Sequence, residues 1–128
     1  TINHANSTLN IKRNGFVTQV SLTTSSTNWV SSSDSRLKDV VEPLTGNLGK
    51  LAACTPVKYR WKPEHDPDDQ TTHLGLITQE VQSVYPEVVS VGNTAQGYLS
   101  LEYTALIPAL VGAINELAAR VVALEARP

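Results

Sequence analysis

The residue types best suited to chemistry lie together at positions 33–38, which read SDSRLK. A serine hydroxyl becomes a nucleophile when a base removes its proton, and a neutral lysine amine can be that base. Ser33 and Lys38 could therefore form a dyad without histidine. The carbonyl nearest to Ser33 along the chain is that of Ser32, and open backbone N–H groups at a helix start could stabilise an oxyanion there. A helix start capped by Ser33 or Asp34 is the alternative interpretation of the same stretch.

The spacing of these two residues limits how they can meet. Apolar residues between Leu37 and Pro43 recur at helical spacing, which predicts a helix in this segment. In a continuous helix, residues five apart point about 140° away from each other, so Ser33 and Lys38 would not share a face. Either Ser33 lies just before the helix, or Lys38 acts on the serine of another chain.

Other candidates for chemistry are few. His73 and Glu80 flank a predicted turn from strand to helix and could orient reacting groups, although a buried histidine and a solvated glutamate are simpler explanations. Cys54 has no basic neighbour in sequence and is interpreted as a small buried residue. No group of His and Cys has the spacing of zinc ligands, and no glycine pattern is typical of phosphate binding. We therefore expect neither a metal nor another cofactor.

Composition limits the class of protein. Of the 128 residues, 41% are apolar and 17% are charged, and the formal net charge is −2. These values argue against general disorder and against a nucleic-acid partner. No uninterrupted apolar run approaches the roughly 18 residues that cross a bilayer, so no membrane partner is expected. The length suits one compact domain with an appendage.

The first 32 residues differ from the rest of the chain. They contain no Asp or Glu and are rich in Ser, Thr and Asn, so they cannot build a core alone. Short alternating apolar stretches and the turn signal Asn14-Gly15 predict one or two short strands that need another surface to bury them. We interpret residues 1–32 as the end of an upstream domain, with a flexible linker as the alternative. A boundary is expected near Ser33.

The remainder alternates helical and strand-like patterns. Helical spacing recurs around residues 44–51 and 78–84. Alternation predicts a strand over 57–61 that pairs with 73–77 across an acidic loop, and a further strand near 88–91. These short elements predict a small mixed α+β domain with a long C-terminal helix.

That C-terminal helix, predicted over about residues 101–127, carries the clearest pattern in the chain. Its apolar residues recur at alternating spacings of three and four, which defines a heptad seam and predicts a coiled coil. Because β-branched residues and leucines alternate along it, the general rules for parallel coiled coils favour two strands. An amphipathic helix packed on its own domain is the alternative. The residues of this seam are Ile107, Leu110, Ile114, Leu117, Val121 and Leu124.

Taken together, these motifs resemble the C-terminal intramolecular chaperone domain of phage endosialidases, tail fibres and neck appendages, which is a self-cleaving serine peptidase domain. A segment of the myelin regulatory factor is similar as well. The motifs follow one another with consistent spacing, which makes the match specific. In chain order they are SDSRLK (33–38), VVEPL (40–44), PVKYRWK (56–62), HLGLITQEVQSVYPEVV (73–89) and YLSLEYTALIPALVGAINEL (98–117).

The resemblance implies a role for each residue of the first motif. Ser33 would be the nucleophile, Lys38 the base, and the bond between Ser32 and Ser33 the one that is cut. Asp34 and Arg36 match the remaining fixed positions and would hold the turn in place. The chain would then be a self-cleaving serine endopeptidase that acts once and needs no cofactor.

The resemblance also implies an assembly. Residues 33–128 would form a homotrimer that assists the folding of an upstream phage fibre or tailspike, of which residues 1–32 are the end. Assembly would take place in the host cytoplasm, after which the passenger joins the virion and the chaperone is released. A non-cleaving trimerisation or adsorption module of a fibre is the alternative. A regulatory factor that releases a DNA-binding half would need a basic domain and a transmembrane segment, which these residues lack.

Overall fold

The computed structural model describes residues 2–3, 8–11, 20–23 and 26–128. The chain divides into two compact units, residues 1–42 and 43–128. The predicted Asn14-Gly15 turn lies outside the described residues. The domain boundary predicted near Ser33 stays a prediction.

Among its described residues, the first unit contains four short antiparallel strands, β1 (Ile2–Asn3), β2 (Thr8–Ile11), β3 (Val20–Thr23) and β4 (Val30–Ser31). They form one sheet in the order β1-β2-β3-β4. The backbone register sets Leu9 opposite Leu22 and Ile11 opposite Val20 across the central pair of strands. The sequence predicted only one or two strands, because strands as short as β1 and β4 leave no alternating pattern to detect.

A single 3-10 helix, Ser35–Leu37, follows this sheet. The longer helix predicted up to Pro43 is wrong, because the chain becomes extended at Lys38, where φ is −121° and ψ is 136°. Two adjacent β-branched valines, Val40 and Val41, follow Asp39 and lower the helix propensity of the segment. Pro43 in addition disfavours the helical conformation at Glu42, the residue before it. These local preferences outweigh the helical spacing of the apolar residues.

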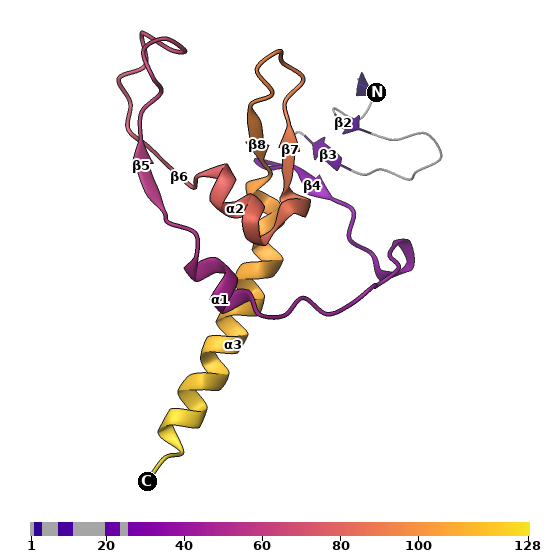
Figure 1. The fold of residues 1–128 in the computed structure, drawn as a ribbon. Helices are drawn as coiled ribbons and strands as arrows, with labels where there is room; N and C mark the ends of the chain where they lie inside the picture. The colour runs from indigo at the N-terminus through magenta and orange to yellow at the C-terminus, as the bar shows by residue number, and fades with distance from the viewer. Residues whose placement is uncertain (1, 4–7, 12–19, 24–25) are drawn as a thin grey trace. The chain divides into compact units, whose positions relative to one another are not determined.

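The second unit combines helices with two hairpins, which confirms the predicted α+β class (Figure 1). Strands β5 and β6 pair antiparallel, as the sequence predicted, and β7 pairs with β8. The elements are α1 (Asn47–Ala52), β5 (Val57–Tyr59), β6 (His73–Gly75), α2 (Thr78–Val84), a 3-10 helix (Pro86–Val88), β7 (Val89–Val91), β8 (Leu99–Leu101), a 3-10 helix (Tyr103–Leu106) and α3 (Ile107–Glu125).

A small core lies where α1, α2 and the start of α3 meet. Its buried side chains are Cys54, Val81, Tyr85, Leu106 and Ala109, so Cys54 is the small buried residue that the sequence predicted. Within this unit the two hairpins extend to one side of the core, and the C-terminal half of α3 projects to the other (Figure 1). Most of α3 therefore has no partner within its own unit.

Helix α3 begins later than the predicted position near residue 101. Leu101 belongs to β8, where it pairs with Val89, and the α-helix starts at Ile107 with Pro108 in its first turn. Proline is favoured at this place because its missing N–H would have no partner in the first turn of a helix. The hairpin and the proline together set the start of the helix.

A buried polar network fixes α1 on α3. Asn47 is fully buried; its Nδ2 donates to the carbonyl of Leu44 (3.0 Å), and its Oδ1 accepts from the hydroxyl of Tyr85 (2.8 Å). The Glu116 carboxylate of α3 accepts the backbone N–H groups of Asn47 (2.9 Å) and Leu48 (2.8 Å). Glu116 therefore satisfies the open donors at the start of α1.

This network leads to a first prediction. Gly112 of α3 faces the Asn47 side chain, and an added Cβ there would overlap its amide group. Because Asn47 is enclosed and cannot move aside, Gly112→Ala should destabilise the second unit by about 1–3 kcal/mol. The control is Gly49→Ala in α1, where a Cβ meets open space and the loss of unfolded-state freedom should stabilise by about 0.4–1 kcal/mol. Urea unfolding followed by circular dichroism would measure both, and equal midpoints for the two variants would contradict the packing described.

Candidate active site

The SDSRLK motif forms one tight turn that Asp34 and Arg36 hold closed. The Asp34 carboxylate caps the 3-10 helix by accepting the Arg36 backbone N–H (2.9 Å). The same carboxylate accepts two hydrogen bonds from the Arg36 guanidinium, from Nε (3.0 Å) and Nη2 (2.8 Å). The backbone N–H groups of Leu37 and Lys38 close the turn onto the carbonyls of Asp34 (3.0 Å) and Ser35 (3.2 Å).

This turn brings Ser33 and Lys38 together. Lys38 Nζ donates to Ser33 Oγ over 2.7 Å, within a single chain. The contact arises because Ser33 precedes the 3-10 helix and Lys38 follows it in an extended conformation. A continuous α-helix would have pointed the two side chains in different directions. Of the two arrangements that the sequence left open, the structure has the one in which Ser33 lies just before a helical turn.

Asp34 and Arg36 form an ion pair of opposite charges within the turn that holds Ser33 and Lys38. The Arg36 guanidinium, with its backbone N–H, holds the pKa of Asp34 below its usual value, and Asp34 in turn raises the pKa of Arg36. Both groups are therefore charged near neutral pH. Because both side chains are exposed, we interpret the pair as a geometric constraint on the turn rather than as a large source of stability.

The bond between Ser32 and Ser33 lies directly after the last strand of the first sheet. Strand β4 ends at Ser31, and its partner β3 precedes it in sequence. All four strands of the sheet therefore lie on the N-terminal side of this bond. Among the described residues of the first unit, no strand pair crosses the bond, so cutting it would leave the sheet whole.

The segment that carries the motif is exposed in the single chain. All residues from 27 to 46 are exposed, including two apolar side chains next to the dyad, Val40 (79% exposed) and Val41 (92%). Adjacent valines with this exposure are unfavourable in water. They indicate a surface that is available to another chain.

The two possible supporting residues have partners inside the second unit. Glu80 Oε2 accepts the backbone N–H of Thr55 (2.8 Å), which ties α2 to the segment before β5. His73 Nε2 lies 2.6 Å from the carboxylate of Asp69, and its ring lies against those of Tyr59 and Trp61. These contacts give each residue a structural role in its own unit.

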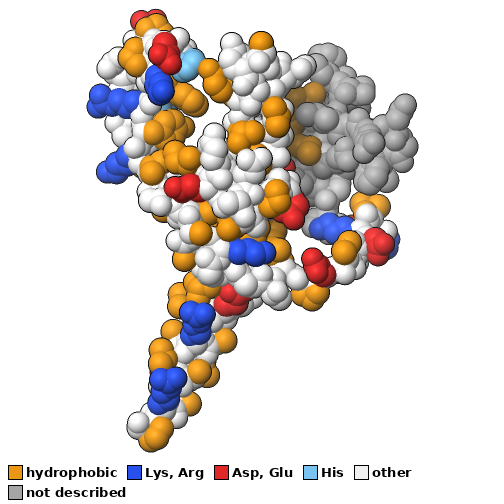
Figure 2. Space-filling model, in the orientation of Figure 1, with side chains coloured by type: hydrophobic (Ala, Val, Ile, Leu, Met, Phe, Trp, Pro, Cys, Tyr) orange, Lys and Arg blue, Asp and Glu red, His pale blue; other side chains and the backbone are white. Residues whose placement is uncertain are grey.

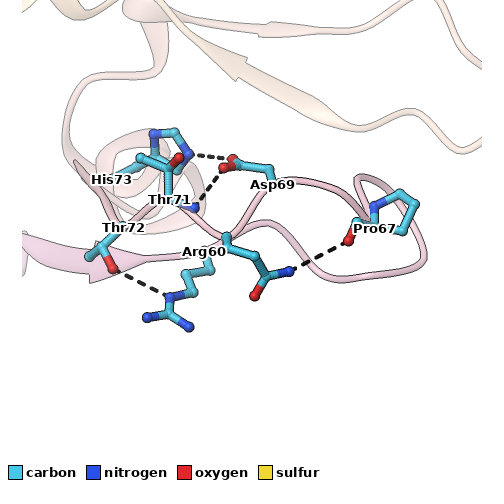
Figure 3. Close-up of polar contacts among 7 residues, drawn as sticks. Arg60, Pro67, Asp69, Thr71, Thr72 and His73 are labelled. Atoms are coloured by element: carbon cyan, nitrogen blue, oxygen red, sulfur yellow. Dashed lines mark hydrogen bonds and ion pairs between the residues drawn. The ribbon is translucent and has the colours of Figure 1, made fainter.

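His73 belongs to a polar cluster that orders the loop between β5 and β6 (Figure 3). Besides His73, the Asp69 carboxylate accepts the backbone N–H of Thr71 (2.7 Å). Arg60 Nε donates to the hydroxyl of Thr72 (3.3 Å) across the two strands. The sequence predicted this loop as an acidic hairpin connection, and the structure adds that one of its acids pairs with His73.

The contacts of the Asp69 carboxylate in this loop should therefore be lost at low pH. The His73 contact and the Thr71 N–H lower the pKa of Asp69 from its usual 3.8 to about 2. Because the folded pKa lies below the unfolded one, the contact stabilises the loop fully above about pH 4 and is lost as the pH falls through about 2. The NMR shift of the Thr71 amide should titrate with a midpoint near 2, and Asp69→Asn should abolish that titration. A midpoint near 4 in the unaltered chain would contradict the contact.

Helix α3 has two different faces. A face of small residues, Ala109, Gly112 and Ala113, lies against α1 together with Glu116. The heptad seam lies on another face, and its six side chains are 45–65% exposed. Figure 2 shows hydrophobic side chains on the surface of the projecting half of the helix. The seam is thus not the surface that packs the helix on its own domain, which was the alternative interpretation of the pattern.

The sequence analysis missed the contact made by Glu116, although one acidic residue inside an apolar helix was a signal for it. The segment Tyr103–Glu125 is long and apolar enough, by length and composition, to cross a membrane. Glu116 lies within it, hydrogen-bonds α1 and has a lowered pKa because it accepts the N–H groups of Leu48 and Asn47. A charged carboxylate committed to protein contacts favours a protein-facing role for this helix.

Comparison with known families agrees with the motifs. Residues 33–90 match the peptidase family described as the chaperone of endosialidase. The match begins at Ser33, the first residue of the turn described above, and ends within β7. It confirms the resemblance inferred from the sequence. Residues 33–90 of this chain are therefore similar to the peptidase family described as the chaperone of endosialidase.

Proposed function

We propose that this chain is a trimeric intramolecular chaperone that assists the folding of an upstream phage fibre or tailspike and then cuts itself free between Ser32 and Ser33. The observation that carries the cleavage is the 2.7 Å contact between Ser33 Oγ and Lys38 Nζ. The family match supports the chaperone role and the peptidase class. Cleavage takes place once per chain, with no external substrate.

In the first step, the neutral Lys38 amine accepts the hydroxyl proton of Ser33. The Ser33 oxygen forms a bond to the carbonyl carbon of Ser32, which gives a five-membered ring and a tetrahedral oxyanion. The N–H groups of Arg36, Leu37 and Lys38 donate within the turn, so those of Asp34 and Ser35 are the candidate donors to the oxyanion.

In the second step, the Lys38 ammonium returns its proton to the leaving nitrogen of Ser33, and the C–N bond breaks. The product is an ester between the Ser32 acyl group and Ser33 Oγ, beside a free α-amine. Water then hydrolyses this ester, which leaves a carboxylate on Ser32 and the hydroxyl on Ser33. Atoms and protons balance, and Lys38 ends in the state in which it began.

Assembly of three chains is the other half of the proposal. A β-rich fibre pairs strands from distant or separate segments, which is slow to nucleate. A module that first gathers the chains raises their effective concentration and shortens that search. The exposed heptad seam of α3 and the exposed valines next to the dyad support such an assembly, because both are apolar surfaces without a partner in the single chain.

The proposal is tested by mapping the products from the freshly expressed chain with an N-terminal tag. We expect one fragment that starts at Ser33 and another that ends at Ser32. Hydroxylamine added during cleavage should trap the ester, so that part of the N-terminal fragment carries a hydroxamate on Ser32. A carboxylate alone, under conditions that trap an ester in a control protein, would contradict the acyl shift. A fragment that starts at another residue would contradict the dyad.

A further inference from the structure

Two opposite charges flank the heptad seam of α3. Arg120 directly precedes the seam residue Val121, and Glu125 directly follows Leu124. Residues five apart on a helix point about 140° away from each other, so Arg120 and Glu125 lie on opposite sides of the seam and cannot meet within one helix. In heptad terms they occupy the two positions that border the apolar core of a coiled coil.

Neither charge has an ion-pair partner among the residues of its own chain that the structure describes. The residue one turn before Arg120 is Glu116, which is the usual position for a helical ion pair. Glu116 instead binds the backbone of Asn47 and Leu48 at the start of α1. Among the described residues, the ion pairs are Arg36 with Asp34, His65 with Glu64 and His73 with Asp69. Arg120 and Glu125 thus remain available for a contact outside the chain.

We propose that, in the assembly proposed above, Arg120 of one copy forms an ion pair with Glu125 of the next, which sets the neighbouring helices parallel and in register. In a parallel coiled coil, the residue that flanks the core on one side lies near the residue five positions later on the neighbouring helix. The spacing of Arg120 and Glu125 meets this requirement. This inference rests on the proposed assembly. It adds that the ion pair determines how neighbouring α3 helices are aligned.

The pair discriminates between alignments that the apolar residues alone would allow. If one helix slips by a heptad, Arg120 lies opposite Ala118 and the ion pair is lost. The seam residues, by contrast, repeat every seven positions and would still interdigitate after such a slip. The charges therefore supply the register that the repeating apolar pattern does not define.

Charge reversal tests this inference. Arg120→Glu and Glu125→Arg, each made in the full chain, should weaken self-association by about tenfold or more, because every attraction at the seam becomes a repulsion. The double variant should recover the original association. An equimolar mixture of the two single variants should recover it only in part, because a trimer built from two kinds of chain always keeps one pair of like charges. Sedimentation velocity across a concentration series would measure all four samples. Circular dichroism would show whether the helix is intact.

Lys58→Glu is the matched control, because it makes the same charge change on an exposed strand residue away from α3. It should leave association unchanged. If the unaltered chain associates but both single reversals associate equally well, the inference is overturned while the proposed assembly stands. Weaker association of both single reversals, recovery in the double variant and no change in the Lys58→Glu control would establish the pair. An unaltered chain that stays monomeric at every concentration would overturn the proposed assembly itself, and this inference with it.

Discussion

Ser33→Ala is expected to leave the chain uncut, with cleavage slowed on the order of 10⁴-fold or more. The reason is that the hydroxyl supplies the attacking oxygen, and Ser33 Oγ is the oxygen that Lys38 contacts in this turn. The 3-10 turn should persist, because the hydrogen bonds that close it involve Asp34, Arg36 and the backbone, and the Ser33 side chain contributes only the contact with Lys38. Intact mass and a denaturing gel of the tagged chain would measure the fraction that remains whole.

The substitution Lys38→Arg tests whether Lys38 acts as a general base or only as a positive charge near Ser33. Arginine keeps a positive hydrogen-bond donor near Ser33 but does not lose its proton near neutral pH. Because general-base catalysis contributes about 10²–10⁴-fold, cleavage should fall by at least about 100-fold. Lys62→Arg, a lysine of the second unit, is the control and should cut normally. Full cleavage of Lys38→Arg would remove the lysine from the mechanism, and an unaltered chain that is never cut would leave the non-cleaving trimerisation module as the function.

The sequence predicted Ser33 and Lys38 as the residues of the candidate site, but it did not predict the way in which they meet. Motif comparison selected Ser33 and Lys38, and helix geometry required Ser33 to lie outside the helix. The single 3-10 turn was not predictable from the apolar spacing between Leu37 and Pro43, since that spacing is helical. The valines and the proline of the segment act on the backbone locally, and the hydrophobic pattern does not report such preferences.

The hydrophobic pattern of α3 predicted one face of the helix but not the other. The heptad seam was visible because large apolar residues repeat along it. The face that binds α1 was not visible in the sequence. It consists of Ala109, Gly112 and Ala113, whose side chains are too small to stand out in a hydrophobic pattern. Close approach of two backbones requires small residues, so a helix face of this kind leaves little trace in the hydrophobic pattern of the sequence.

The origin of the base can be decided with two chains that are each inactive alone. Ser33→Ala keeps Lys38, and Lys38→Ala keeps Ser33, so a mixed assembly contains both groups but never in the same chain. The 2.7 Å contact lies within one chain, and we therefore expect that coexpression restores no cleavage. If a lysine served the serine of a neighbouring copy, the Lys38→Ala chain would be cut in mixed assemblies.

Tags of different size would distinguish the two chains on a denaturing gel, and capture through one tag would prove that they assemble together. The control is the unaltered chain coexpressed with Ser33→Ala, in which unaltered chains should be cut and the variant chains should stay whole. Cleavage of the Lys38→Ala chain in the mixture would show that the base comes from a neighbour. In its absence, each chain carries a complete dyad, and any dependence of cleavage on assembly must act by ordering the exposed segment around Val40 and Val41 rather than by delivering a missing residue.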